Sequence, residues 1–279
     1  MTERVTLITG ASAGIGTELA RVFASHGHRL ALVARRADRL EALAAEITAA
    51  GGAAPIVIPC DLVQPDSGDR IAEALAAAGL EVEYVVNNAG FGLFGAVEET
   101  SLDEARNQFE TTFWGAVRLI EQVLPSMRAR RSGRIINVSS VLGFMPVPFQ
   151  AFYVASKHAL EGYSEVLNLE VRPFGIFVSL IEPSFIRTGF FEHRQEARAP
   201  LDVYKAQRTR VSPMMRQRTD AGSDPDVVAG VILKAIGAAD PAVRYPVGLN
   251  GAMLQATRSF LPAFVFDRVL RKSFALDES

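Results

Sequence analysis

The sequence has little of what disulfide-bonded or metal-binding proteins need. Cys60 is the only cysteine among 279 residues, so no internal disulfide can form, and a reducing, cytoplasmic location is the simplest expectation. The four histidines show no spacing that would join one of them to a second His or Cys ligand; they are His26, His28, His158 and His193. We therefore expect neither a disulfide framework nor a metal site.

Long apolar runs and a strong charge imbalance are also absent. No apolar run reaches the roughly 20 residues of a membrane span, and residues 2–4 lead into a short strand where a signal peptide would have an apolar region. A net charge of −2 gives no reason to expect nucleic acid as a partner. The basic stretch 194–218 indicates the solvated face of a flexible lid near 190–220, or a surface for anionic lipid or an acidic substrate. A peripheral membrane contact therefore stays open.

Short apolar runs alternate with longer helical patterns along the whole chain. At 49% hydrophobic and 22% charged residues, the chain can bury one large core. The alternation predicts parallel βαβ units, and hence one α/β domain over 1–279 with a doubly wound sheet of about seven strands and helices on both faces. Strands are predicted at 5–9, 30–34, 55–60, 84–86, 135–138, 177–181 and 243–247, one long helix at 102–127, and an amphipathic tail near 253–276.

A glycine-rich turn follows the first predicted strand. Gly10, Gly14 and Gly16 have the spacing G-x-x-x-G-x-G, which differs from the G-x-G-x-x-G fingerprint. Glycine lets the backbone approach a pyrophosphate closely, and the helix that follows offers free N–H groups and the positive end of its dipole. The turn therefore predicts a phosphate-binding site.

Ser140, Tyr153 and Lys157 form a second candidate site. Tyr153 and Lys157 stand four residues apart in a helix-compatible run, so both side chains leave the same face. The apolar run 135–138 delivers Ser140 to the carboxyl end of a strand, where open α/β sheets bind ligands. Singly, these would be a turn residue, a packing residue and a solvated charge. Together they predict an acid/base site, in which the Lys157 ammonium should lower the pKa of the Tyr153 phenol from its usual value near ~10.

With these motifs the sequence resembles the short-chain dehydrogenase/reductase family. The matching pieces occur in the family's order between about residues 5 and 189. They are Thr9-Gly10-Ala11-Ser12-Ala13-Gly14-Ile15-Gly16, Asn87-Asn88-Ala89-Gly90, Ser140, Tyr153-x-x-x-Lys157, and Pro183 followed by Thr188. The resemblance implies a Rossmann-type fold, a homo-oligomer (dimer or tetramer) and NAD(P)-dependent interconversion of a carbonyl and an alcohol. Tyr153 would exchange the proton, Ser140 would hold the substrate oxygen, and Lys157 would also bind the nicotinamide ribose.

The resemblance also assigns contacts with the cofactor. It places Asp61 and Leu62 beside the adenine, and Ile186 and Thr188 beside the nicotinamide carboxamide. The other implied contacts are Gly10, Ser12, Ala13, Gly14, Ile15, Gly16, Asn88, Ala89, Gly90, Tyr153, Lys157 and Pro183.

The end of the second predicted strand bears on the choice between NAD and NADP. Folds that select NAD have an acidic residue there, which accepts hydrogen bonds from the ribose 2′-OH. Here Arg35 and Arg36 occupy this position, and no acid occurs before Asp38. Guanidinium groups bind phosphate through paired, charge-assisted hydrogen bonds, and the Ser12 hydroxyl could add another. We predict NADP(H) as the cofactor, the alternative being that an arginine merely extends into solvent.

Two positions depart from the family's pattern. Thr112 precedes Gly115 by three residues, where the family usually has an Asn that supports a water leading to Lys157. Thr112 either holds that water, as a further catalytic residue, or simply bonds its own backbone. Ser184 stands where a Gly usually follows Pro183, which we interpret as loop variation.

The predicted function is therefore an NADP(H)-dependent oxidoreductase acting on a small-molecule carbonyl or alcohol. Apolar residues in loops at the carboxyl edge predict a dry pocket for a steroid, a retinoid or a long-chain aldehyde or ketone, or else they seal the lid onto the core. They are Phe91, Phe94, Leu142, Phe144, Met145, Phe149, Phe185 and Phe190. Two alternatives stay open: a related epimerase or dehydratase, and a non-catalytic NADP-binding redox sensor or scaffold. The first usually has a larger C-terminal domain, and the second would have lost the catalytic groups.

Overall fold

The computed structural model describes residues 3–248 and 251–276. Seven parallel strands form one sheet in the order β3-β2-β1-β4-β6-β7-β9. They are β1 (Glu3–Thr9), β2 (Leu30–Ala34), β3 (Ile56–Pro59), β4 (Leu80–Asn87), β6 (Gly133–Val138), β7 (Ile176–Pro183) and β9 (Arg244–Val247). The chain adds strands on one side of β1 and then on the other, so the strand order reverses between β1 and β4, where open α/β sheets bind ligands.

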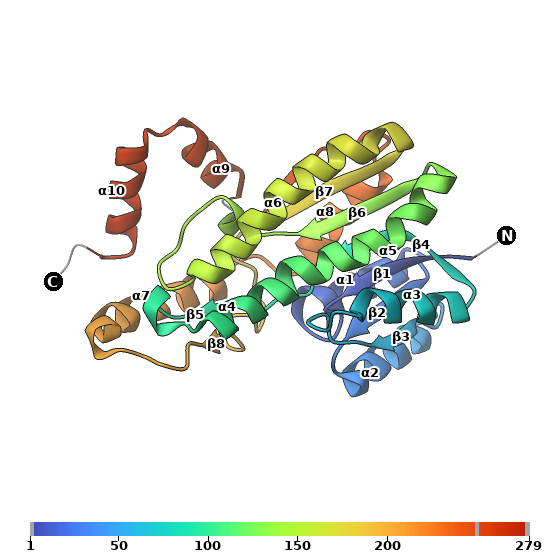
Figure 1. Cartoon of the computed structure of the whole chain (residues 1–279), viewed down its shortest axis with the longest axis horizontal. Coiled ribbons are helices and arrows are strands. Elements are labelled where there is room, and N and C mark those ends of the chain that lie inside the picture. The colour runs from blue at the N-terminus through green and yellow to red at the C-terminus, as the bar shows by residue number, and fades with distance from the viewer. Residues whose placement is uncertain (1–2, 249–250, 277–279) are drawn as a thin grey trace.

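Helices cover both faces of this sheet (Figure 1). One face packs against α1 (Gly14–Ser25), α2 (Ala37–Ala49) and α8 (Asp226–Gly237), and the other against α3 (Ser67–Ala77), α5 (Gly115–Arg130) and α6 (Ala151–Val171). The predicted doubly wound α/β sheet of about seven strands is confirmed.

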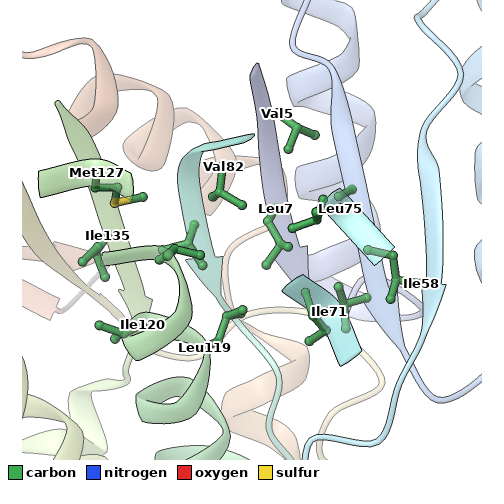
Figure 2. Packing of buried hydrophobic residues seen from close by; sticks show 14 of the residues in the cluster. Val5, Leu7, Ile58, Ile71, Leu75, Val82, Leu119, Ile120, Met127 and Ile135 are labelled. Atoms are coloured by element: carbon green, nitrogen blue, oxygen red, sulfur yellow. The ribbon is translucent and has the colours of Figure 1, made fainter. Parts of the chain in front are cut away.

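Alternation along the strands produces two separate cores. Leu7 and Ile135 point to the face of α5, while their neighbours Ile8 and Ile136 point to the face of α1, because successive side chains of a strand leave opposite faces. Figure 2 shows the first core, in which strand residues meet apolar residues of α3 and α5. Both faces are apolar, as expected for a parallel sheet covered on both sides.

The long helix predicted at 102–127 is interrupted. The structure has α4 (Leu102–Phe109), a π-helical turn at Glu110–Trp114 and then α5. Ser101 caps α4, since its hydroxyl accepts a hydrogen bond from the backbone N–H of Glu104 at 3.2 Å. A π turn widens the helix locally, and such turns are frequent at functional sites.

Most of the remaining elements lie beyond the carboxyl edge of the sheet, and one short turn, Arg172–Phe174, precedes β7 at the amino edge. A short ribbon joins β5 (Leu93–Phe94) to β8 (Gln195–Glu196), and α7 (Lys205–Asp220) follows. The chain ends in α9 (Gly251–Phe260) and α10 (Ala263–Ser273). Short 3₁₀ turns occur at Val97–Glu99, Val141–Gly143, Arg172–Phe174 and Asp202–Tyr204. Within the described ranges, no helix combines the length and the apolar character needed to cross a bilayer.

Candidate active site

A buried chain of amides fixes the strand ends that carry the site. Asn87 ends β4, and its Nδ2 donates to Oδ1 of Asn137 on β6 at 2.8 Å. Nδ2 of Asn137 donates in turn to Oγ of Ser164 on α6 at 2.8 Å. This support was not predicted, although two asparagines inside buried apolar runs were a usable signal. These hydrogen bonds tie the carboxyl edge of the sheet to the helix that carries Tyr153 and Lys157.

Tyr153 and Lys157 lie together at the start of α6. The helix begins at Ala151, two residues before Tyr153. Tyr153 is 6% exposed and Lys157 is 4% exposed. Nζ of Lys157 donates to the backbone carbonyl of Val138 at 2.7 Å and lies 5.8 Å from the centre of the Tyr153 ring. One of the three ammonium protons is used in this way, which leaves two for a ligand.

Burial controls the ionisation of this pair. It raises the pKa of Tyr153 to about 12, against a smaller opposing effect of hydrogen bonding to Ser140. It lowers the pKa of Lys157 to about 8, against the attraction of the Glu161 carboxylate. Lys157 was expected to lower the pKa of Tyr153, but the structure gives the opposite direction, because loss of water around a charged phenolate raises this pKa and only the hydrogen bond with Ser140 opposes the rise.

Ser140 stands beside Tyr153 at the end of β6. It caps the 3₁₀ turn that follows, and its Oγ accepts a hydrogen bond from the backbone N–H of Leu142 at 3.1 Å. Oγ also donates a hydrogen bond to the carbonyl oxygen of Pro183 at 3.4 Å. The hydroxyl is thereby oriented next to the phenol.

The glycine turn fits the phosphates of a dinucleotide. Gly10 and Gly14 have φ angles of +69° and +53°, which favour glycine. A Cβ on Gly16 would collide with the carbonyl oxygen of Gly10, and a Cβ on Gly10 would lie 2.9 Å from Cα of Ala89. The residue before α1 is Ala13, whose side chain offers no cap. The first N–H groups of α1 are therefore free of side-chain capping and suited to bind an anion.

The two arginines after β2 differ in their surroundings. Nη2 of Arg36 donates to Oγ of Ser12 at 3.1 Å and to its carbonyl oxygen at 3.2 Å. Arg35 is exposed, and its side chain makes no hydrogen bond or ion pair with the described part of the chain. Arg36 and Ser12 thus form a basic and hydroxyl-bearing corner beside the glycine turn, as a 2′-phosphate would need.

Two adjoining cavities open beside Ser140 and Tyr153. The first, of about 120 Å³, is lined by both of these residues and closed by side chains from the segment before α7 and from α7 itself, including Phe190, Phe191 and Met215. The second, of about 420 Å³, shares four lining residues with the first and extends beneath α9 and α10. The shared residues are Val141, Leu142, Ser184 and Phe185.

The sequence predicted only part of this lining. Leu142, Met145, Phe185 and Phe190 do line the cavities. Phe94 and Phe149 instead pack against each other in a core cluster, with ring centres 5.6 Å apart. Phe91 and Phe144 are half-buried and line neither cavity. Lining residues that were not predicted come from α7, from α10 and from the residue that follows α10; they are Met215, Thr219, Phe266, Val269, Leu270 and Phe274.

Comparison with known sequences decides the family. Residues 4–199 match the sequence model of the family described as short chain dehydrogenase. The chain belongs to the short-chain dehydrogenase/reductase family. It is 33% identical to a 3-ketodihydrosphingosine reductase of Bacteroides thetaiotaomicron, over 99% of this chain and 100% of that protein. It is 38% identical to retinol dehydrogenase 8 of Bos taurus, over 93% of this chain and 86% of that protein. The protein is thus a dehydrogenase/reductase that acts on CH–OH or C=O groups.

Solved structures of the family share the fold. A short-chain dehydrogenase from Streptomyces avermitilis is 32% identical, with a TM-score of 0.81 over 97% of this chain and 98% of that one. A metagenomic short-chain oxidoreductase in complex with NADP is 30% identical, with a TM-score of 0.69 over 88% and 96%. A 3-oxoacyl-[acyl-carrier protein] reductase from Brucella melitensis with bound NAD is 29% identical, with a TM-score of 0.67 over 83% of each chain. Family structures thus bind either nicotinamide dinucleotide.

The other cofactor contacts implied by the family pattern fall into two groups. Around the turn, the backbone N–H groups of Asn88 and Ala89 donate to Oγ1 of Thr9 at 3.0 and 3.1 Å, and Thr188 packs against Gly14. The second group lies at the same edge of the sheet. Gly90 follows β4, Pro183 is the last residue of β7, and Ile186 follows β7.

Asp61 and Leu62 follow β3 at the far side of the turn. Oδ1 of Asp61 accepts a hydrogen bond from the backbone N–H of Val63 at 3.2 Å. The Leu62 side chain is buried in the core, and its carbonyl oxygen accepts a hydrogen bond from Arg118. The side chain of Leu62 therefore packs in the core and does not face an adenine site.

Thr112, where the family usually has Asn, lies within the π turn. Its Oγ1 accepts a hydrogen bond from Nε2 of Gln108 at 2.7 Å, so its hydroxyl is held by a side chain. A Cβ on Gly90 would lie 3.8 Å from this oxygen and 4.0 Å from Nζ of Lys157, so both groups border the same glycine. Gln108 was missed by the sequence analysis, although it precedes Thr112 by one helical turn.

Proposed function

We propose that this short-chain dehydrogenase/reductase uses NADP(H) to interconvert a carbonyl and an alcohol on a lipophilic substrate. The observation that carries the proposal is the apolar cavity of about 420 Å³ adjoining the space beside Ser140 and Tyr153. Ligand pockets commonly have volumes of roughly 300–1,000 Å³ and apolar walls. A steroid, a retinoid or a long-chain aldehyde or ketone would place its apolar part here and its oxygen beside Tyr153.

The proposed cofactor is NADP(H). Support comes from Arg36, which lies against Ser12 of the glycine turn, and from the absence of an acidic residue between β2 and Asp38. An acid at the end of β2 would repel a 2′-phosphate, whereas a guanidinium and a hydroxyl bind one. The cofactor supplies or accepts the hydride.

The chain's own residues supply the proton and hold the substrate. Tyr153 would protonate the carbonyl oxygen during reduction, and burial keeps its phenol protonated over the working pH range, since its pKa is raised to about 12. Ser140 would donate a hydrogen bond to the same oxygen. Lys157 would bind the ribose hydroxyls with its two remaining protons and return a proton toward Tyr153.

We also propose that the chain works as a single domain, with residues 190–220 as a lid and 253–276 as a tail. Support comes from the cavities, since side chains of α7, α9 and α10 complete their walls. Residues 249–250, which connect the tail to the domain, lie outside the described residues.

The test is a screen of NADPH oxidation with ketones and aldehydes graded by chain length, together with a steroid and a retinoid. We expect kcat/KM to rise with apolar size. Thr257→Trp would fill the second cavity and should reduce kcat/KM for long substrates while sparing short ones. Thr48→Trp, on the exposed side of α2, is the matched control. A flat response to chain length, with equal values for both variants, would contradict the lipophilic assignment.

A further inference from the structure

The turn between α9 and α10 exposes an apolar tip. Residues 260–264 read Phe-Leu-Pro-Ala-Phe and carry no charge. Phe260 is 86% exposed and Phe264 is 76% exposed. Figure 1 shows α9 and α10 set apart from the sheet, at the end of the molecule where α7 also lies. Two phenylalanines exposed within five residues leave considerable apolar surface in water, which marks interaction sites on soluble proteins.

Helices α9 and α10 together form a helical hairpin, the α9–α10 hairpin. The side of this hairpin that faces away from the solvent is anchored to the protein. Leu254, Phe266 and Leu270 face inward and line the second cavity, and Phe274 packs beneath the guanidinium of Arg218 at 4.8 Å. Nη2 of Arg218 also donates to the carbonyl oxygen of Ser273 at 3.0 Å. The hairpin is therefore fixed at its base and presents its apolar tip to solvent. The exposure of the tip does not come from loose packing of the whole hairpin.

Basic residues stand behind the tip along α10. Arg268 follows Phe264 by four residues and Arg271 follows it by seven, so they share one face of the helix, together with Asp267, which pairs with Arg271 at 3.8 Å. At about 1.5 Å per residue, the two arginines lie roughly 6 and 10 Å behind Phe264. With the apolar tip buried to the depth of about 5–10 Å that interfacial apolar groups reach, these guanidinium groups would lie at the headgroups.

The charge of the hairpin has the sign that anionic lipid requires. Four basic residues stand against one acidic residue within 251–276, a net charge of +3; they are Arg258, Arg268, Arg271, Lys272 and Asp267. Asp277 and Glu278 follow in the sequence, outside the described residues. The chain as a whole carries −2, so this positive charge is local. Each basic residue near an anionic surface contributes on the order of 1 kcal/mol to binding.

We propose that the α9–α10 hairpin docks the protein on anionic lipid bilayers, with Phe260 and Phe264 inserted and the basic face of α10 on the headgroups. The surface does not depend on the catalytic groups. The hairpin also contributes residues to the wall of the second cavity, so docking would bring this apolar cavity close to a lipid surface.

Vesicle flotation of the full chain, without substrate or cofactor, tests the proposal. Phosphatidylcholine vesicles with and without phosphatidylserine are the two probes. We expect binding to the phosphatidylserine vesicles, and weaker binding at high salt. Phe260→Ser with Phe264→Ser should weaken it at least about tenfold, since two exposed rings lose their burial. Arg268→Gln should weaken it roughly fivefold on the anionic vesicles alone.

The matched control is Val203→Ser with Leu169→Ser, which removes apolar side chains that are 77% and 73% exposed elsewhere. It should bind vesicles like the wild type, and circular dichroism would show that every variant is folded.

Wild-type protein that stays unbound from both vesicle types overturns the proposal. So does a wild-type oligomer that dissociates in the Phe260→Ser, Phe264→Ser variant, because the tip would then be an interface between copies of this chain. Turnover of a water-soluble carbonyl compound, measured separately, reports on the proposed enzymatic function, so the two proposals can fail independently.

Discussion

At the scale of single residues, the arrangement of Tyr153 and Lys157 favours proton donation. Both side chains are buried, which raises the pKa of the phenol to about 12 and lowers that of the ammonium to about 8. Near neutral pH the phenol therefore holds its proton, and Lys157 is still mainly charged. This is the state needed to protonate a carbonyl oxygen, whereas alcohol oxidation needs a phenolate that burial alone disfavours.

The first prediction separates the role of Tyr153 from that of Lys157. Tyr153→Phe should abolish turnover and leave NADPH affinity nearly unchanged, because the lost hydroxyl acts on the substrate. Lys157→Ala should damage both, since its ammonium is also proposed to hold the ribose. Steady-state kinetics and NADPH titration by fluorescence measure the two effects. More than a few per cent of kcat remaining in Tyr153→Phe would show that another group supplies the proton.

The second prediction concerns the selection of NADP. Replacing Arg35 and Arg36 by glutamine should weaken NADPH binding by roughly 2–3 kcal/mol, as expected for one or two charge-assisted hydrogen bonds, and leave NADH binding unchanged. Arg36→Gln alone should account for most of the loss, because Arg36 already contacts Ser12. Arg39→Gln, an exposed arginine on α2, is the control. A wild-type enzyme that uses NADH as efficiently as NADPH would refute the assignment.

At the scale of elements, the π turn at Glu110–Trp114 was not predictable from the sequence pattern. Apolar periodicity indicated one helix over this region, since a single widened turn barely disturbs a 3.6-residue repeat. The turn coincides with Thr112, the position that departs from the family pattern. Strands and the glycine turn were predictable because buried runs and glycine spacing are local signals. The hydrogen bond from Gln108 to Thr112 has the spacing of one helical turn, but the sequence does not show which of the polar side chains at this spacing bond to each other.

The third prediction tests whether the Thr112 hydroxyl takes part in proton transfer. Thr112→Val should lower kcat by about tenfold or more, within the range that general acid–base assistance contributes, while packing is retained. Thr112→Ser keeps the hydroxyl and should keep most of the activity, and Thr112→Asn should be tolerated. The pH profile of kcat distinguishes this role from a purely structural one. An unchanged kcat and pH profile in Thr112→Val would exclude the hydroxyl from the relay.

At the scale of the whole molecule, the last strand completes a charge cluster that sequence reasoning could not assemble. Arg244 of β9 forms ion pairs with Glu161 and Glu165 of α6 and with Glu182 of β7. The side chains of Glu161 and Glu182 are almost fully buried, and the cluster lies one helical turn beyond Lys157. The strand and both carboxylates were visible in the sequence, but nothing local pairs residues that lie 62 or more positions apart.

The same limit applies to the cavity walls and to the C-terminal hairpin. The predicted amphipathic tail does form two helices, α9 and α10. The elements that this tail packs against decide which of its faces lines a cavity and which stays exposed. Helical periodicity identifies an apolar face, yet it does not say whether that face meets a core, a ligand or a membrane. Tyr153 and Lys157, by contrast, lie one turn apart on the same helix, so their spacing alone brings them together, and Ser140 follows a strand that ends at the same edge of the sheet.

The buried cluster leads to the last prediction, the dependence of stability on pH. Burial and repulsion by Glu161 raise the pKa of Glu182 from 4.5 to about 7, with Arg244 opposing. The folded protein therefore keeps a proton on Glu182 that the unfolded chain releases near pH 4.5. Binding of this proton stabilises the folded state. The stabilisation has its full value below pH 4.5 and is lost as the pH rises through about 7.

Urea denaturation between pH 5 and 8 measures this loss, which should be on the order of 2 kcal/mol. Glu182→Gln keeps the shape and the hydrogen-bond acceptor of the side chain but cannot ionise, so the decline of stability toward pH 8 should largely disappear. Glu165→Gln is the matched control, because Glu165 pairs with the same Arg244 at 2.9 Å but is half exposed. That variant should keep the wild-type slope. If Glu182→Gln kept the slope as well, another group would hold the proton, and Glu161, whose pKa burial also raises, would be the next to replace.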